Sequence, residues 1–99
     1  MSQTYPTDAQ IYLPRLHALQ DEMRTRLEML VNIDSGTGQI EGVNHIMSYV
    51  AQWLRDIGFH VTLHPSDGLG NNLVARRNGT GSARILLVGH VDTVYAPGS

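Results

Sequence analysis

Residues 84–95 read Arg-Ile-Leu-Leu-Val-Gly-His-Val-Asp-Thr-Val-Tyr, and this stretch decides the expected fold. The apolar run at residues 85–88 does not alternate with polar residues, which is typical of a strand covered on both faces in an α/β sheet. Residues two apart on a strand point the same way, roughly 6.5–7 Å apart. His90 and Asp92 are therefore expected to face one site beyond the carboxyl end of the strand, where open α/β sheets bind their ligands.

His90 and Asp92 are residue types that metal sites combine. Neutral imidazole is a good zinc ligand, and its second ring nitrogen usually donates to a carboxylate that fixes the tautomer and orientation of the ring. The spacing alone leaves a second interpretation open, because a strand-end histidine followed by an aspartate that caps a turn gives the same pattern.

The upstream residues predict two helices. A first apolar helical face runs to about residue 32, through Leu16, Leu19, Met23, Leu27 and Leu30. Pro14 lies in the first turn of this helix or kinks it. A second amphipathic helix is expected from about residue 40 to 57, with Gly58 as its left-handed C-terminal cap.

Two further strands precede residues 84–89. Residues 59–63 alternate between apolar and polar side chains, the period of a half-buried strand. Residues 72–77 predict the second strand. The expected order is α-α-β-β-β with a mixed sheet, after a loose lead-in at residues 1–9.

The expected fold is incomplete by itself. A doubly buried strand needs neighbours on both edges and layers on both faces, which two helices and two other strands hardly supply. Without them the third strand leaves a polar edge and an apolar face in water. We therefore expect the 99 residues to open a larger domain.

Composition narrows the classes of function. A net charge of −2 gives no basic surface for nucleic acid or for an anionic membrane. Cysteine is absent and all seven basic residues are arginine, which excludes thiolate chemistry, a lysine Schiff base and a Walker-type phosphate loop. No signal-peptide pattern opens the chain and no apolar run approaches the ~20 residues of a membrane span, so we expect a cytoplasmic protein.

Four stretches resemble, in order and spacing, the co-catalytic di-zinc exopeptidases. This family includes glutamate carboxypeptidases of the carboxypeptidase G type, aminoacylase, acetylornithine deacetylase and succinyl-diaminopimelate desuccinylase. Residues 87–95 resemble its first metal-binding motif, and residues 30–38 its loop between the first two helices. Residues 53–61 resemble the second helix running into the first strand, and residues 72–75 the segment before the metal-binding strand.

The resemblance extends over roughly residues 10–97 and implies a fold. The chain is expected to be the N-terminal portion, residues 1–99, of a three-layer αβα metallopeptidase catalytic domain. The ending Asp-Thr-Val-Tyr at residues 92–95 favours the glutamate carboxypeptidase branch.

Carried over by position, the resemblance makes His90 a zinc ligand and gives Asp92 a catalytic role as the carboxylate that steers or polarises that imidazole. The complete enzyme would hold two zinc ions that activate a shared water and polarise an amide carbonyl. The family's other ligands and its glutamate general base match no position in this chain. The resemblance thus implies a fragment, inactive alone, of an enzyme that releases an amino acid, with glutamate favoured, from a small peptide or N-acyl amino acid.

Two other functions also fit the residues. A truncated paralogue would act without catalysis as a binding or oligomerisation module, in which the unpaired strand edge accepts a partner strand or a second copy of the chain. A small metal carrier would use His60, His64 and His90. His60 and His64 are expected to face solvent, and they lie four apart on a strand, too far for one ion.

Overall fold

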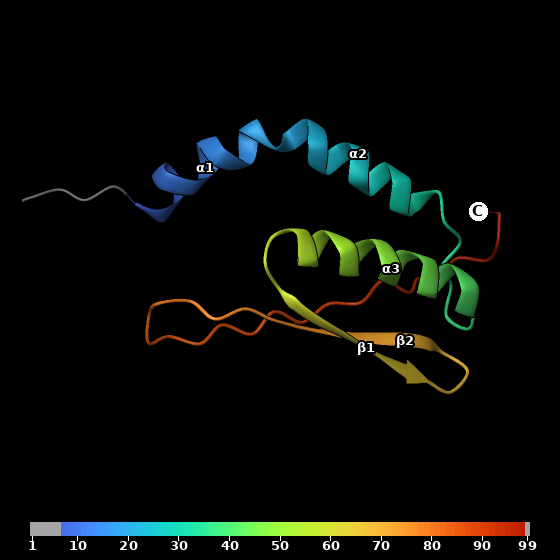
Figure 1. Cartoon of the computed structure of the whole chain (residues 1–99). Coiled ribbons are helices and arrows are strands. Elements are labelled where there is room, and N and C mark those ends of the chain that lie inside the picture. Colours follow the sequence, from blue (N-terminus) through green and yellow to red (C-terminus); the bar gives the residue numbers. More distant parts are fainter. Residues whose placement is uncertain (1–6, 99) are drawn as a thin grey trace, which may run out of the picture. The chain divides into compact units, whose positions relative to one another are not determined.

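The computed structural model describes residues 7–98 (Figure 1). Its elements are α1 (Asp8–Ala18), α2 (Gln20–Val31), α3 (Ile40–Asp56), β1 (His60–Ser66) and β2 (Gly70–Arg76). The mixture of helix and strand agrees with the expected α/β class. The chain divides into two compact units, the first ending at Asn32 and the second beginning at Ile33. Most of the expected lead-in, residues 1–6, lies outside the described residues, and helix begins at Asp8.

The first unit consists of two helices where the sequence predicts one. Helix α1 begins with a capping box, in which Thr7 Oγ1 accepts from the Gln10 amide at 3.2 Å and the Gln10 side chain accepts from the Thr7 amide at 2.8 Å. Pro14 lies inside α1. The interruption falls instead at Leu19, whose amide donates to the carbonyl of Leu16 at 3.1 Å, the tightened turn typical of a helix end.

The second unit is built on α3, which packs against the antiparallel hairpin of β1 and β2 (Figure 1). The apolar stripe of α3 supplies the core residues Val43, Ile46 and Ala51. Gly58 follows the helix with φ +92°, which confirms the predicted left-handed cap. None of the helices in the described part of the chain is long and apolar enough to cross a membrane.

The hairpin keeps the predicted alternation but has different bounds. Val61 and Leu63 are half-buried whereas His60 and His64 are exposed, as the period of two predicts. The pairing runs from His60 opposite Arg76 to Ser66 opposite Gly70, so both strands extend into the predicted 65–70 loop. Pro65 is tolerated in β1 because both strands of a two-stranded sheet are edge strands.

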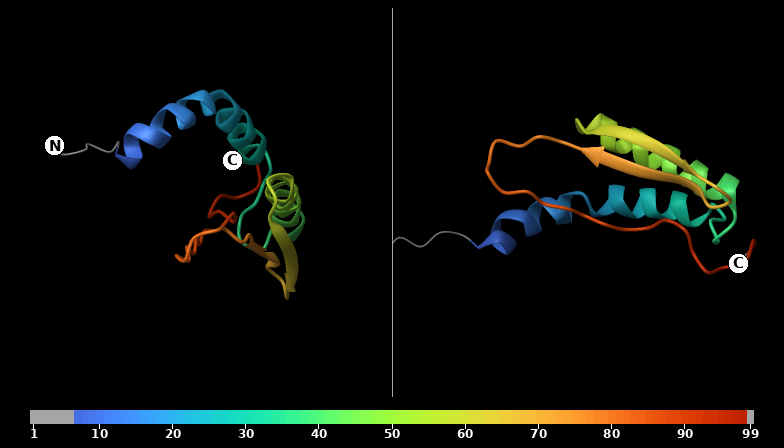
Figure 2. Two further views of the ribbon diagram at one scale, coloured as in Figure 1. Left: turned by 60° about the vertical axis from the view of Figure 1, so that its left-hand side comes forward. Right: turned by 90° about the horizontal axis from the view of Figure 1, so that it is seen from below.

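Residues 84–89, predicted to form the third strand, belong to no strand of the described residues 7–98. They form an irregular segment after β2 (Figure 2), and the side chains of residues 85–88 are 85–89% exposed. A strand requires a partner backbone, and β1 and β2 pair only with each other. The structure therefore has the order α-α-α-β-β, and it does not show the expected mixed three-stranded sheet or three layers.

Truncating the small core of the second unit is expected to be costly. Ile46→Ala should lower the free energy of unfolding by about 2–5 kcal/mol, because Ile46 is buried on the face of α3 that meets the hairpin. Ile57→Ala is the matched control, since Ile57 is 56% exposed at the end of the same helix. Urea unfolding followed by circular dichroism measures both, and equal losses would contradict the assigned core.

Candidate functional site

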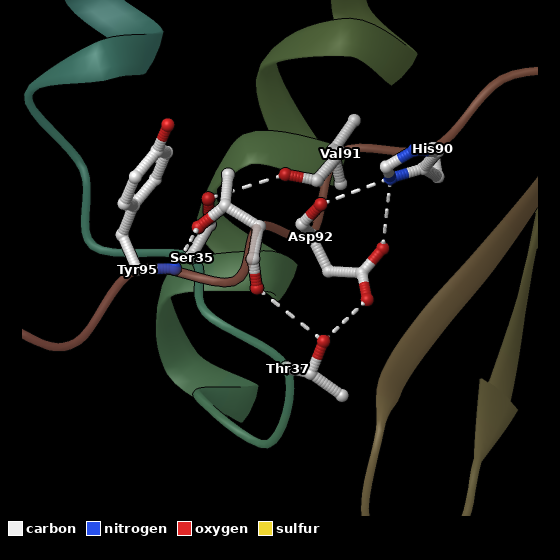
Figure 3. A network of polar contacts seen from close by, with 7 residues as sticks. Ser35, Thr37, His90, Val91, Asp92 and Tyr95 are labelled. Atoms are coloured by element: carbon white, nitrogen blue, oxygen red, sulfur yellow. Dashed lines mark hydrogen bonds and ion pairs between the residues drawn. The ribbon is translucent and has the colours of Figure 1, made fainter.

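The candidate site lies where the 34–38 loop meets the 90–95 segment (Figure 3). Gly36 and Thr93 form an isolated parallel bridge. The Thr93 amide donates to the Ser35 carbonyl at 2.8 Å, and the Thr37 amide donates to the Thr93 carbonyl at 2.9 Å. The hydroxyl of buried Ser35 donates to the Val91 carbonyl at 3.1 Å. Two stretches far apart in the sequence are thus held side by side by backbone contacts.

Two glycines permit this close approach. A Cβ on Gly36 would lie 2.5 Å from the carbonyl oxygen of Tyr95. A Cβ on Gly42, in the first turn of α3, would lie 1.6 Å from the carbonyl oxygen of Asp34. The 34–38 loop therefore lies directly against α3 on one side and against the 90–95 segment on the other.

His90 and Asp92 are in contact. Nδ1 of His90 lies 2.9 Å from the backbone oxygen of Asp92 and 3.2 Å from its carboxylate oxygen Oδ1. The other carboxylate oxygen, Oδ2, accepts a hydrogen bond from Thr37 Oγ1 at 2.8 Å. Figure 3 shows this chain of contacts from the loop to the imidazole ring. The structure brings together the pair that the sequence singled out, while the role of each residue stays a prediction.

The contacts of Nδ1 assign the tautomer of neutral His90. An ionised carboxylate and a carbonyl only accept hydrogen bonds, so Nδ1 must carry the proton. The lone pair then lies on Nε2. The side chain of His90 is 81% exposed, which leaves this nitrogen accessible. The ring thus offers an accessible imidazole nitrogen, an atom type that zinc ions bind, while its other nitrogen contacts both the backbone oxygen and the carboxylate of Asp92.

The hydrogen bond from Thr37 is the largest cause that holds the pKa of Asp92 below its usual value. Desolvation of the carboxylate opposes this effect. The charge and hydrogen bond of His90 lower the pKa of Asp92 further. Asp92 is therefore ionised at neutral pH, as the acceptor role toward His90 requires.

Within the described residues, His90 does not belong to a cluster of metal-binding side chains. Among residues 7–98, no group of three or more histidine, cysteine, aspartate or glutamate side chains is placed to hold a metal ion. His60, His64 and His90, the ligands of the alternative metal carrier, are therefore not grouped in the described residues. Zinc sites use three or four protein ligands, so the chemistry of His90 fits one ligand position of such a site.

A shallow pocket of about 360 Å³ lies beside this arrangement, between the 34–38 loop and the 90–95 segment; it is lined by Gly36, Thr37, Gln39 and residues 93–97. The amide of Gly98 donates to both carboxylate oxygens of Asp34, at 3.3 and 3.2 Å. The segment after Asp92 is therefore held against the loop as far as Gly98.

Sequence reasoning missed Ser35 and Thr37 as site residues and placed them only in a loop between two helices. Their partners Val91 and Asp92 lie 56 and 55 residues away, which no local pattern reveals. The one available signal was the resemblance of residues 30–38 to a loop of the same family as the 87–95 motif.

Comparison with known proteins identifies several relatives. The chain is 43% identical over 74 residues to carboxypeptidase G2 of Pseudomonas sp. (strain RS-16). The match covers 73% of this chain and 18% of that protein. It is 39% identical over 66 residues to acetylornithine deacetylase of Pectobacterium atrosepticum, covering 64% of this chain and 17% of the relative. The acetylornithine deacetylase of Vibrio parahaemolyticus is 37% identical over 54 residues, covering 54% and 14%.

The chain spans less than a fifth of the length of the curated relatives that it matches. No protein-family model matches the chain. No solved structure matches it either.

Proposed function

Because this chain belongs to the family of carboxypeptidase G2 and acetylornithine deacetylase, we propose that it forms the N-terminal segment of the catalytic domain of a zinc-dependent hydrolase that cleaves amide bonds. The observation that carries the proposal is the meeting of the 34–38 loop with the 90–95 segment. Both stretches resemble the family, and together they hold the imidazole of His90 with its Nε2 accessible.

His90 is the proposed zinc ligand, through Nε2. Asp92 accepts a hydrogen bond from the protonated Nδ1, which fixes the orientation of the ring and makes Nε2 a better metal ligand. A zinc site supplies a water of lowered pKa and polarises an amide carbonyl. The remaining ligands and the general base come, in this proposal, from parts of the protein outside these 99 residues. The isolated chain is then inactive, because one imidazole does not make a zinc site.

The proposed substrate class is a small peptide or an N-acyl amino acid, with release of a glutamate-type product favoured. Two observations support the carboxypeptidase branch over the deacetylase branch. The identity to carboxypeptidase G2 is 43%, against 39% and 37% for the two deacetylases compared. The ending Asp-Thr-Val-Tyr at residues 92–95 is the other.

The proposal also gives residues 84–89 a place in a complete domain. Their apolar side chains are 85–89% exposed at residues 85–88, far from what a finished interior strand shows. We propose that the rest of the catalytic domain covers this segment on both faces, completing a three-layer αβα arrangement. A non-catalytic pairing module is less favoured, because the relatives carry the names of enzymes.

A segment exchange tests the proposed function. A segment of carboxypeptidase G2 is replaced by its counterpart from this chain, chosen to include the 34–38 loop and the 90–95 segment. We expect the exchanged protein to bind zinc and to retain carboxypeptidase activity, since the segment supplies a ligand in the required position. Zinc content by atomic absorption and steady-state hydrolysis of the host's own substrate are the measurements.

An exchange into an acetylornithine deacetylase host provides the second arm. Activity in the carboxypeptidase host alone supports the favoured branch, and activity in both supports a shared amide-hydrolase role. A folded exchanged protein that binds no zinc in either host contradicts the proposal.

A further inference from the structure

The hydroxyl of Thr37 has one proton and two nearby acceptors. Its oxygen lies 2.8 Å from Oδ2 of Asp92 and 3.4 Å from the carbonyl oxygen of Thr93. The shorter distance and the negative charge of the carboxylate both favour donation to Asp92. The same carbonyl of Thr93 already accepts from the backbone amide of Thr37. The hydroxyl therefore donates its hydrogen bond to the carboxylate of Asp92, while the backbone amide of Thr37 holds the bridge to Thr93.

The two oxygens of the Asp92 carboxylate face different partners. Oδ2 accepts from Thr37 and Oδ1 faces Nδ1 of His90 at 3.2 Å. The Asp92 side chain is 41% exposed, so without the threonine hydroxyl the carboxylate is free to turn toward water. Thr37 is thus the contact that keeps Oδ1 directed at the imidazole.

From this geometry we infer that Thr37 is a positioning residue, which orders the Asp92 carboxylate and through it fixes the protonated nitrogen of His90. The inference deepens the proposed function, because it makes Nε2 of His90 a prearranged metal donor. The tautomer is nevertheless a property of the metal-free chain. It can be measured whether or not the zinc assignment holds.

The backbone of Asp92 offers a competing explanation. Its carbonyl oxygen lies 2.9 Å from Nδ1 of His90, closer than Oδ1 does. If this carbonyl alone fixed the tautomer, loss of the Thr37 hydroxyl would leave the ring unchanged. The two explanations therefore predict different results for a substitution at Thr37 that removes only the hydroxyl.

Thr37→Val is that substitution. Valine keeps the branched shape of threonine, and the backbone amide that donates to Thr93 remains. Long-range ¹H–¹⁵N NMR spectra of the metal-free 99-residue chain, at a pH where the ring is neutral, report which imidazole nitrogen carries the proton. We expect His90 to be predominantly protonated on Nδ1 in the wild-type chain. In Thr37→Val we expect its tautomer populations to move toward those of exposed His64, the internal standard.

Two further variants exclude a merely structural effect. Thr37→Ser restores the hydroxyl and is expected to restore the Nδ1-protonated form. Thr62→Val removes a threonine hydroxyl from an exposed position on β1 and is expected to leave His90 unchanged. The amide resonances of β1 and β2 report in every variant whether the second unit is folded.

Each outcome decides the inference. An unchanged tautomer in folded Thr37→Val, failure of Thr37→Ser to restore it, or an equal change in Thr62→Val would overturn the positioning role. Zinc affinity of the exchanged carboxypeptidase is a separate readout. There Thr37→Val should weaken binding by about 10-fold, the lower end of the roughly 10–100-fold loss seen when a partner of a ligand is removed. A tautomer effect without zinc binding would leave the positioning role standing and reject only the metal assignment.

Discussion

Replacing His90 with alanine in the exchanged carboxypeptidase is expected to abolish hydrolysis and to lower its zinc content. The substitution removes the only donor atom that this chain is proposed to give the metal. The loss of activity should therefore exceed the roughly 100-fold that removal of an outer partner can bring. The Asp92→Asn variant should lose about 10–100-fold in activity, because an amide keeps the shape of the carboxylate but accepts a weaker hydrogen bond from Nδ1. Activity and zinc content are measured on the same preparations.

The matched control for this experiment is His64→Ala. His64 is an exposed histidine of β1 outside the contacts of the candidate site, so its loss should leave both activity and zinc content unchanged. Equal losses in the two variants would show that His90→Ala damages the folded protein in general and does not specifically remove a metal ligand. A His90→Ala protein that keeps full zinc content would reject His90 as the ligand, even if activity fell.

The sequence predicted those parts of the fold that local patterns determine. The amphipathic helix expected at about residues 40–57, the cap at Gly58 and the alternation around Val61 depend on residues a few positions apart, and the structure confirms them. The interruption at Leu19 was missed because the apolar face continues through it at helical spacing. A pattern that satisfies one long helix does not distinguish it from two consecutive ones.

Residues 84–89 failed as a strand for a different reason. Their composition records burial on both faces, yet burial needs partner residues that the described chain does not provide. The composition of this segment thus indicates the environment that it requires, which is burial on both faces, but it does not determine a strand conformation by itself. The same limit applies to Thr37, whose partner Asp92 is 55 residues away. The spacing of His90 and Asp92 was readable, while the contact that orders their geometry depends on the tertiary meeting of two loops.

Gly42→Ala is the second prediction with a large expected effect. We expect it to destabilise the protein, which is the opposite of what helix propensity alone predicts. In the interior of a helix, alanine is about 1 kcal/mol more favourable than glycine. A Cβ at this position, however, would lie 1.6 Å from the carbonyl oxygen of Asp34 and 2.8 Å from its carbonyl carbon. Because the obstacle is backbone, the 34–38 loop must move away from α3. We expect a net destabilisation of about 1–3 kcal/mol, typical of an overpacked site.

Gly79→Ala supplies the contrast that makes this interpretation testable. A Cβ on Gly79 would meet no heavy atom within 4 Å, and the φ of this residue is not positive. Alanine there should therefore be neutral or stabilise by about 0.4–1 kcal/mol through the unfolded chain. The midpoints of urea unfolding show whether each variant is more or less stable than the wild-type chain. The amide resonances of Thr37 and Thr93 report whether the bridge between Gly36 and Thr93 is retained. A higher midpoint for Gly42→Ala, with the bridge resonances unchanged, would show that the loop does not lie against α3. The support for Thr37, and through it for the imidazole of His90, would then have to come from elsewhere.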